Sequence, residues 1–166
     1  MTIKTRTFSA LAVGAFMFAG IMSAQAGMQD STTITVSLWD KGTSAEMSTD
    51  LGMDMGGDAS KANMGLDISA DQVQAGKITF KVVNASKEIV HEMVVFPLAD
   101  GEKIPYDANE AKINEDTAGH LGEVSELEPG KGGTLTIDLK PGKYILACNI
   151  ATHFANGMWK VITVTK

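Results

Sequence analysis

The stretch "KYILACNIATHFANGMWKVITVT", residues 143–165, decides the fold of this chain. It contains two apolar segments of strand length, 143–148 and 158–165, which are joined by a loop of small and polar residues. β-Branched and aromatic residues are frequent in both segments, and such residues favour strands. We therefore expect the chain to end in two β-strands with this loop between them.

Short strands of the same kind are predicted further upstream. Apolar residues alternate with polar ones in 33–39, 77–83 and 133–139, and a denser apolar run in 89–96 is typical of a strand that is covered on both faces. Turn signals rich in glycine, proline and asparagine separate these segments. Strands with this spacing predict an all-β sandwich or barrel, in which alternate residues fill one core.

Two longer stretches interrupt the strand pattern. Residues 40–64 are rich in glycine, aspartate and serine and are expected to form a long loop, with one extra short strand at 66–68. In the second stretch, 99–119, Asp107 is expected to cap a short helix that runs to about Ile113. One helix inside a long connection between strands fits a Greek-key topology.

The chain begins with the features of a secretory signal peptide. Lys4 and Arg6 precede an apolar run, 8–22, which is followed by the small-residue triplet "AQA". This order predicts a signal peptide, residues 1–26, that is cleaved after Ala26. The apolar run is short for a membrane anchor, because a helix needs about 20 apolar residues to span a bilayer.

The remaining residues, 27–166, have the length of one domain, and no second domain is indicated. Of the 14 basic side chains, Lys4 and Arg6 fall in the signal peptide, which leaves 12 against 20 acidic ones and a net charge near −8. No basic patch is present, and this argues against nucleic acid as a partner. We expect a periplasmic domain with no membrane span after cleavage.

The loop between the last two strands carries a set of metal ligands. Cys148, His153 and Met158 follow one another at the spacing Cys-x4-His-x4-Met. A thiolate, an imidazole and a thioether suit copper far better than calcium or magnesium, and zinc rarely takes a thioether. Cys148 is the only cysteine, and a free thiol is a liability in an oxidising compartment unless it is buried as a small apolar residue or bound to a metal.

A trigonal copper site needs one more histidine, and the candidates are His91 and His120. His91 begins "HEMVVF" in the strongest predicted strand, from which its ring could reach the same end of a sandwich as the cysteine. His120 lies in "TAGHLGE" between glycines, where a solvent-exposed histidine is expected.

The segment "YILACNIATHFANGMWKVITV", together with the upstream "HEMVVF", resembles the cupredoxins, the blue-copper proteins of the plastocyanin, azurin and rusticyanin type. The resemblance covers residues 64–166. It implies a Greek-key β-sandwich that binds one type 1 copper per chain. It further implies that His91, Cys148 and His153 are the equatorial ligands and Met158 the long axial ligand.

Two features depart from the cupredoxin pattern. Cupredoxins often carry asparagine directly after the first histidine ligand, whereas this chain has Glu92 there and Asn149 after the cysteine. We expect Asn149 to donate to Glu92, whose charge would lower the reduction potential; the alternative is that Glu92 points to solvent. The 40–64 loop also holds several methionines, which could bind a second copper or simply make apolar contacts: Met47, Met53, Met55 and Met64.

These features favour an electron carrier in which copper cycles between Cu(I) and Cu(II). Its redox partners, a cytochrome or a copper enzyme by resemblance, are expected to dock near His153, which small and apolar neighbours surround: Ile150, Ala151, Phe154, Ala155 and Gly157. Phe154 could instead pack into the sandwich. The alternative is a copper-handling protein that serves as chaperone, store or resistance factor. Catalysis by this chain alone is not expected, because only His120 would remain for a catalytic copper.

Overall fold

The computed structural model describes residues 32–45, 51 and 61–166. The elements are β1 (Thr32–Asp40), β2 (Met64–Ile68), β3 (Gln72–Gln74), β4 (Gly76–Asn84), β5 (His91–Leu98), β6 (Tyr106–Asp107), β7 (Lys112–Ile113), α1 (Glu115–Ala118), β8 (Gly122–Leu127), β9 (Gly132–Leu139), β10 (Gly142–Ala147) and β11 (Trp159–Thr165). The predicted signal peptide and Met47, Met53 and Met55 lie outside the described residues.

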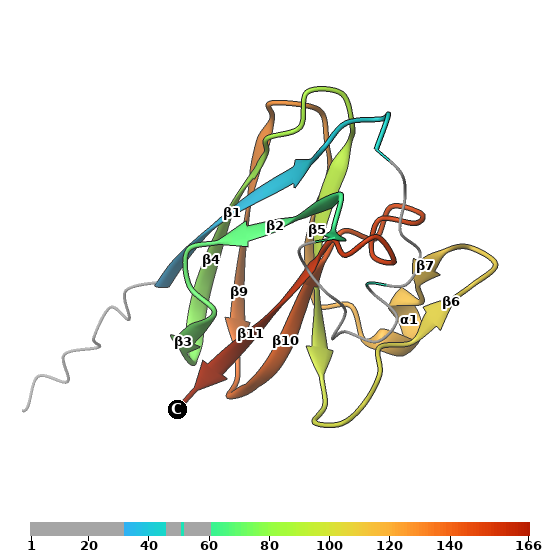
Figure 1. Cartoon of the computed structure of the whole chain (residues 1–166). Coiled ribbons are helices and arrows are strands. Elements are labelled where there is room, and N and C mark those ends of the chain that lie inside the picture. The colour runs from blue at the N-terminus through green and yellow to red at the C-terminus, as the bar shows by residue number, and fades with distance from the viewer. Residues whose placement is uncertain (1–31, 46–50, 52–60) are drawn as a thin grey trace, which may run out of the picture.

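Two sheets form the body of the domain (Figure 1). One has the strand order β2-β1-β4-β9 and the other the order β3-β11-β10-β5-β8. The pairs β1–β4 and β3–β11 are parallel, and the other pairs in these sheets are antiparallel. The expected all-β sandwich is confirmed, and each predicted strand is present, including the extra one at 66–68, which is β2.

The core lies between the two sheets and is filled by alternate residues of their strands. On β1 and β4 the inward side chains are those that the alternation indicates: Ile34, Val36, Leu38, Ile78, Phe80 and Val82, all at most 2% exposed. Met64 of β2 is buried in the same core, so its thioether packs among apolar side chains.

Strand β5 is covered on both faces, which explains its dense apolar sequence. Met93 and Val95 face the main core, whereas Val94 and Phe96 belong to a second apolar cluster on the other side of the sheet. That cluster is completed by residues of the β5–β8 connection and of the final loop: Ile104, Ile113, Ala118 and Phe154. The long connection is therefore packed onto the sandwich beside the end of β10.

The helix predicted from Asp107 to Ile113 is wrong in position. The side chain of Asp107 accepts hydrogen bonds from the N–H groups of Asn109 and Glu110, but this closes a turn between the short strands β6 and β7. The helix of this connection is α1, which begins at Glu115, after its N-cap Asn114 and beyond the end of the predicted helix. An aspartate that bonds its own downstream N–H groups initiates turns as readily as helices, and here the turn prevails.

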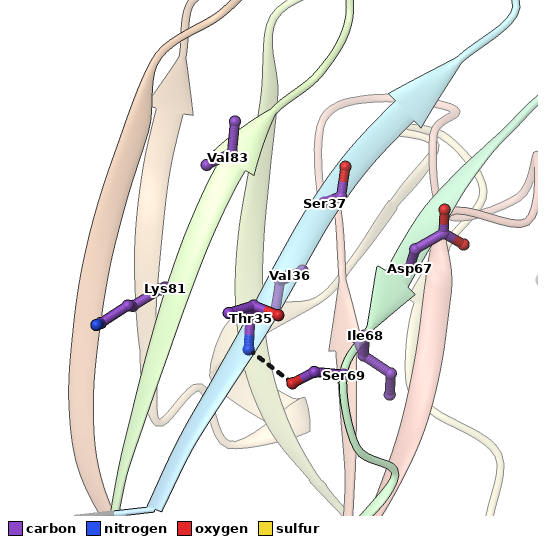
Figure 2. Close-up of a pocket in the computed structure, with 8 residues that line it drawn as sticks. All are labelled: Thr35, Val36, Ser37, Asp67, Ile68, Ser69, Lys81 and Val83. Carbon is purple, nitrogen blue, oxygen red and sulfur yellow. Dashed lines mark hydrogen bonds between the residues drawn. The ribbon is translucent and has the colours of Figure 1, made fainter.

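A shallow groove of about 430 Å³ runs over the outer face of the β2-β1-β4 sheet (Figure 2). Near its centre the N–H of Thr35 donates to Ser69 Oγ at 2.9 Å. Its lining contains no histidine or cysteine, and the groove is separate from the candidate centre described below. Within the described residues, no helix is long and apolar enough to cross a membrane.

Candidate metal centre

Three strands bring the predicted ligands to one end of the sandwich. β10 pairs with β5 on one side and with β11 on the other, so Ala147 lies opposite both Val94 and Trp159. His91 is the first residue of β5, and Cys148 follows β10 directly. The pairing therefore places residues 57 positions apart in the chain next to each other.

The loop after Cys148 is closed by its own backbone. The N–H of Cys148 donates to the carbonyl of Met158 at 3.0 Å, and the N–H of Met158 donates to the carbonyl of His153 at 3.1 Å. Gly157 has φ +95°, and a Cβ there would lie 3.2 Å from Cβ of Ala62. Glycine is the residue that tolerates both this dihedral angle and this close approach.

The donor atoms of His91, Cys148 and His153 converge. Nδ1 of His91 lies 3.2 Å from Nδ1 of His153, and the cysteine Sγ lies 3.3 Å from the latter and 4.0 Å from the former. The three side chains are 0%, 0% and 7% exposed. A point in the plane of these atoms is about 2.1 Å from each, close to the bond lengths of about 2.0–2.3 Å that zinc makes to the same donor types.

Met158 is fully buried in the hydrophobic cluster that also contains Cys148. Two imidazoles and one thiolate, with a thioether from the same loop, are the donor set of copper sites that carry electrons, whereas hard cations would require oxygen ligands. The residues present therefore fit copper. His120 is exposed and lies 3.9 Å from Glu123, away from this set, as expected.

Burial keeps the two imidazoles neutral and the thiol protonated before metal binds. Desolvation lowers the pKa of His91 and lowers that of His153 to about 4, to which the charge of His91 also contributes. Burial raises the pKa of Cys148 to about 12. A metal ion that binds the sulfur must therefore displace a proton, whereas both imidazoles are already uncharged.

The sulfur of Cys148 is held by the neighbouring strand. The N–H of Glu92 donates to Sγ at 3.4 Å, and a hydrogen bond from the backbone of Ile150 also favours the thiolate. Hydrogen bonds of this kind withdraw charge from the sulfur and restrict its position.

Glu92 does not point to solvent, since it is only 8% exposed. The N–H of Asn149 donates to Glu92 Oε1 at 3.1 Å, so the expected contact between the two residues is present. The donor is the main chain, because the side-chain amide of Asn149 is used elsewhere. It accepts from the N–H of Ile113 at 2.7 Å and donates to Glu115 Oε1 at 2.8 Å.

The surface around His153 differs in part from the expectation. Phe154 and Ala155 are buried, and Phe154 packs against Tyr106 with ring centroids 5.8 Å apart. Phe154 cannot belong to a docking patch, because it fills the second apolar cluster instead, and Ala155 is only 5% exposed. The His153 ring borders a hollow of about 270 Å³, which is lined on its other sides by Gly42, Thr43, Ala45, Asn63, Met64 and Ile89.

The sequence reading missed one residue of this centre. Asp40 ends β1, and its Oδ2 lies 2.8 Å from Nε2 of His91. In the sequence Asp40 opens the polar stretch 40–64, so it looks like an ordinary loop residue. Only the parallel pairing of β1 with β4 brings it beside the start of β5.

Comparison with known proteins agrees with this geometry. The sulfocyanin (SoxE) domain matches residues 74–166. Dithionite-reduced auracyanin from Roseiflexus castenholzii is 23% identical over 82% of this chain and 98% of its own, with a TM-score of 0.54. Auracyanin B is 20% identical over 81% and 89%, with a TM-score of 0.54. Rusticyanin from Thiobacillus ferrooxidans is 15% identical over 80% and 75%, with a TM-score of 0.51.

At these identities the structural neighbours establish the fold, and the cupredoxin-like sandwich is confirmed. No curated protein matches the chain. The family match extends over more than half of the residues and includes Cys148, His153 and Met158 as well as His91. This family match confirms the cupredoxin relationship, with copper as the cofactor of such domains. The chain belongs to the sulfocyanin (SoxE) family of cupredoxin-like, blue-copper domains.

Proposed function

We propose that this protein carries single electrons in the periplasm through one type 1 copper, held by His91, Cys148, His153 and Met158. The observation that carries this proposal is the buried triangle of donor atoms with sides of 3.2, 3.3 and 4.0 Å. Bound copper would supply the Cu(I)/Cu(II) couple. We further propose residues 27–166 as the exported domain, released by cleavage after Ala26.

The protein's own residues make the ligand frame rigid. His91 is fixed by β5 and by its bond to Asp40, and Cys148 is fixed by β10 and by the N–H of Glu92. A His2Cys frame with a weak thioether is acceptable to both oxidation states of copper, so a rigid frame keeps the rearrangement on electron transfer small.

The route for electrons is proposed to pass through the ring of His153. This side chain is 7% exposed and borders the small hollow, whereas the other three proposed ligands have no exposed surface. A redox partner, a cytochrome or a copper enzyme, would approach this side. Small contacts of limited area suit partners that must separate quickly after transfer.

Copper handling is the alternative function, and one argument for it was the set of methionines near the 40–64 loop. Met64 packs in the core on β2, so it is not available as a surface thioether for a second copper. Catalysis by this chain would need a second copper with its own histidines, and only the exposed His120 remains after the proposed ligands are assigned.

The test is the visible spectrum of the protein, expressed with its own leader, purified from the periplasm and titrated with Cu(II). An intense thiolate-to-copper band that saturates at one equivalent, bleaches with ascorbate and is absent from Cys148→Ala is expected. Mass spectrometry of the same sample gives the cleavage site. A colourless protein that binds only Cu(I) or prefers zinc would overturn the electron-carrier proposal.

A further inference from the structure

The second nitrogen of His91 is bonded to a buried carboxylate. Asp40 Oδ2 lies 2.8 Å from Nε2 of His91, and the two side chains are 4% and 0% exposed. The bond joins the end of β1 to the start of β5, two segments 51 positions apart in the chain. It lies on the side of the imidazole opposite to Nδ1, the atom that faces Cys148 and His153.

Asp40 is itself held firmly in place. Its Oδ1 accepts from the N–H of Gly42 at 2.7 Å, and the carboxylate also receives a hydrogen bond from the side chain of Ser86. Ser86 Oγ accepts from the N–H groups of Glu88 and Ile89 at 3.2 and 2.9 Å, so its single proton is left for Asp40. The carboxylate is thus held on one side by Ser86 of the turn between β4 and β5, and on the other side by His91.

These contacts decide which nitrogen of His91 carries the proton. The carboxylate of Asp40 already accepts hydrogen bonds from the N–H of Gly42 and the hydroxyl of Ser86, and it lies 2.8 Å from Nε2 of His91. An ionised carboxylate only accepts, so the proton of a neutral His91 lies on Nε2. The lone pair is then on Nδ1 and points at the other two donors.

We propose that Asp40 is a positioning residue for the copper centre: it fixes His91 as an Nδ1 donor, and its buried negative charge lowers the reduction potential. A carboxylate behind a metal-bound imidazole makes the imidazole a stronger donor, and this favours the more positive ion, Cu(II), over Cu(I). The part concerning the potential rests on the proposed function. The part concerning the tautomer does not.

A purely structural role, in which Asp40 only ties β1 to β5, makes different predictions. Asp40→Asn keeps the shape of the side chain and a carbonyl oxygen that can accept from Nε2, but it removes the charge. If the contact were only structural, this variant would have an unchanged potential. Asp138→Asn on β9 removes one charge from an exposed position and is the matched control.

The first experiment is redox titration of the copper-loaded wild type, Asp40→Asn and Asp138→Asn. We expect Asp40→Asn to shift the ratio of Cu(II) to Cu(I) affinities by at least tenfold toward Cu(I), which is a rise of about 59 mV for a one-electron couple. Asp138→Asn should stay close to wild type. Equal potentials in all three proteins would overturn the tuning role.

The second experiment needs no copper. Nitrogen-15 NMR of the histidine rings in the metal-free wild type should show His91 protonated at Nε2 in slow exchange with water, and Asp40→Ala should lose that signature. A wild-type His91 protonated at Nδ1 would overturn the positioning role. Absence of the blue band in the wild type would refute the proposed function alone, because this reading of the tautomer is independent of copper.

Discussion

Glu92 accepts a hydrogen bond from the backbone N–H of Asn149 at 3.1 Å, while its own backbone N–H donates to Cys148 Sγ at 3.4 Å. One residue therefore contacts both the sulfur and the residue that follows it. Burial raises the pKa of Glu92, and the nearby carboxylates of Glu123 and Glu115 raise it further. Above that pKa its charge would act on the copper with little screening by water, because the residue is only 8% exposed. The backbone contact restricts the sulfur, and the carboxylate sets part of the local field.

We expect Glu92→Gln to raise the reduction potential of the copper-loaded protein. Glutamine keeps an oxygen that can accept from Asn149 N–H, but it removes a negative charge that favours Cu(II). Redox titration measures the effect, and Glu128→Gln, which neutralises an exposed residue after β8, is the control. A potential that does not rise in Glu92→Gln would show that this carboxylate has no influence on the couple.

The side chain of Asn149 ties the copper loop to the long connection. Asn149→Ala would leave the buried N–H of Ile113 without its acceptor at 2.7 Å. An unsatisfied buried group costs about 1–3 kcal/mol, so the free energy of unfolding should fall by that amount. Denaturant titration measures it. Asn109→Ala, in the exposed β6–β7 turn, should cost clearly less, and equal losses in the two variants would contradict the assigned role.

Much of this architecture could be predicted from the sequence because strand alternation reports burial directly. Ile34, Val36 and Leu38 alternate in β1 and are all buried. The strands that were missed carry little of this signal: β3 has three residues, and β8, "GEVSEL", is mostly polar because it lies at the edge of its sheet. Their pairing depends on neighbours that are distant in the chain.

The loop ligands could be predicted from the sequence, whereas the residue that holds His91 in place could not. Cys148, His153 and Met158 lie within eleven residues, so their spacing is visible in the sequence. Asp40 is linked to the centre only through tertiary contacts, since β1 runs parallel to β4 and ends beside the following turn. The sequence likewise left open whether Phe154 lies in a docking patch or packs into the sandwich, because its burial depends on packing against Tyr106 in the long connection.

The metal-free protein should lose stability in mild acid through His153. Burial and the neighbouring His91 lower the pKa of His153 in the folded state to about 4, from an ordinary value of 6.5. Between these pH values the unfolded chain binds a proton at this residue and the folded chain does not. The free energy of unfolding should therefore decrease as the pH falls from 6.5 toward 4, by at most about 3 kcal/mol from this group.

Denaturant titrations of the metal-free wild type and His153→Gln across this pH range isolate the effect. The variant should show a flatter decrease, because the residue that takes up the proton on unfolding is gone. His120→Gln, which removes an exposed histidine outside the centre, is the control. Parallel curves for wild type and His153→Gln would mean that other groups account for the acid sensitivity.

Gly157 should be far less tolerant of a side chain than an exposed glycine with a similar backbone. Both Gly157 and Gly101 have positive φ, +95° and +77°, so alanine is strained at either position by roughly 1–2 kcal/mol. At Gly101 a Cβ would meet nothing within 4 Å, whereas at Gly157 it would lie 3.2 Å from Ala62 and 3.4 Å from Leu51. The difference between the two variants measures the packing contribution.

We expect Gly157→Ala to lower the free energy of unfolding by more than Gly101→Ala, as measured by denaturant titration of the metal-free proteins. Because Gly157 directly precedes Met158, the shift needed to relieve the contact should also move the proposed axial ligand. The visible and electron paramagnetic resonance spectra of the copper-loaded Gly157→Ala protein should therefore change, while those of Gly101→Ala should match wild type. Wild-type spectra and equal stability losses in both variants would show that the loop has room for the methyl group and that Met158 is positioned by other contacts.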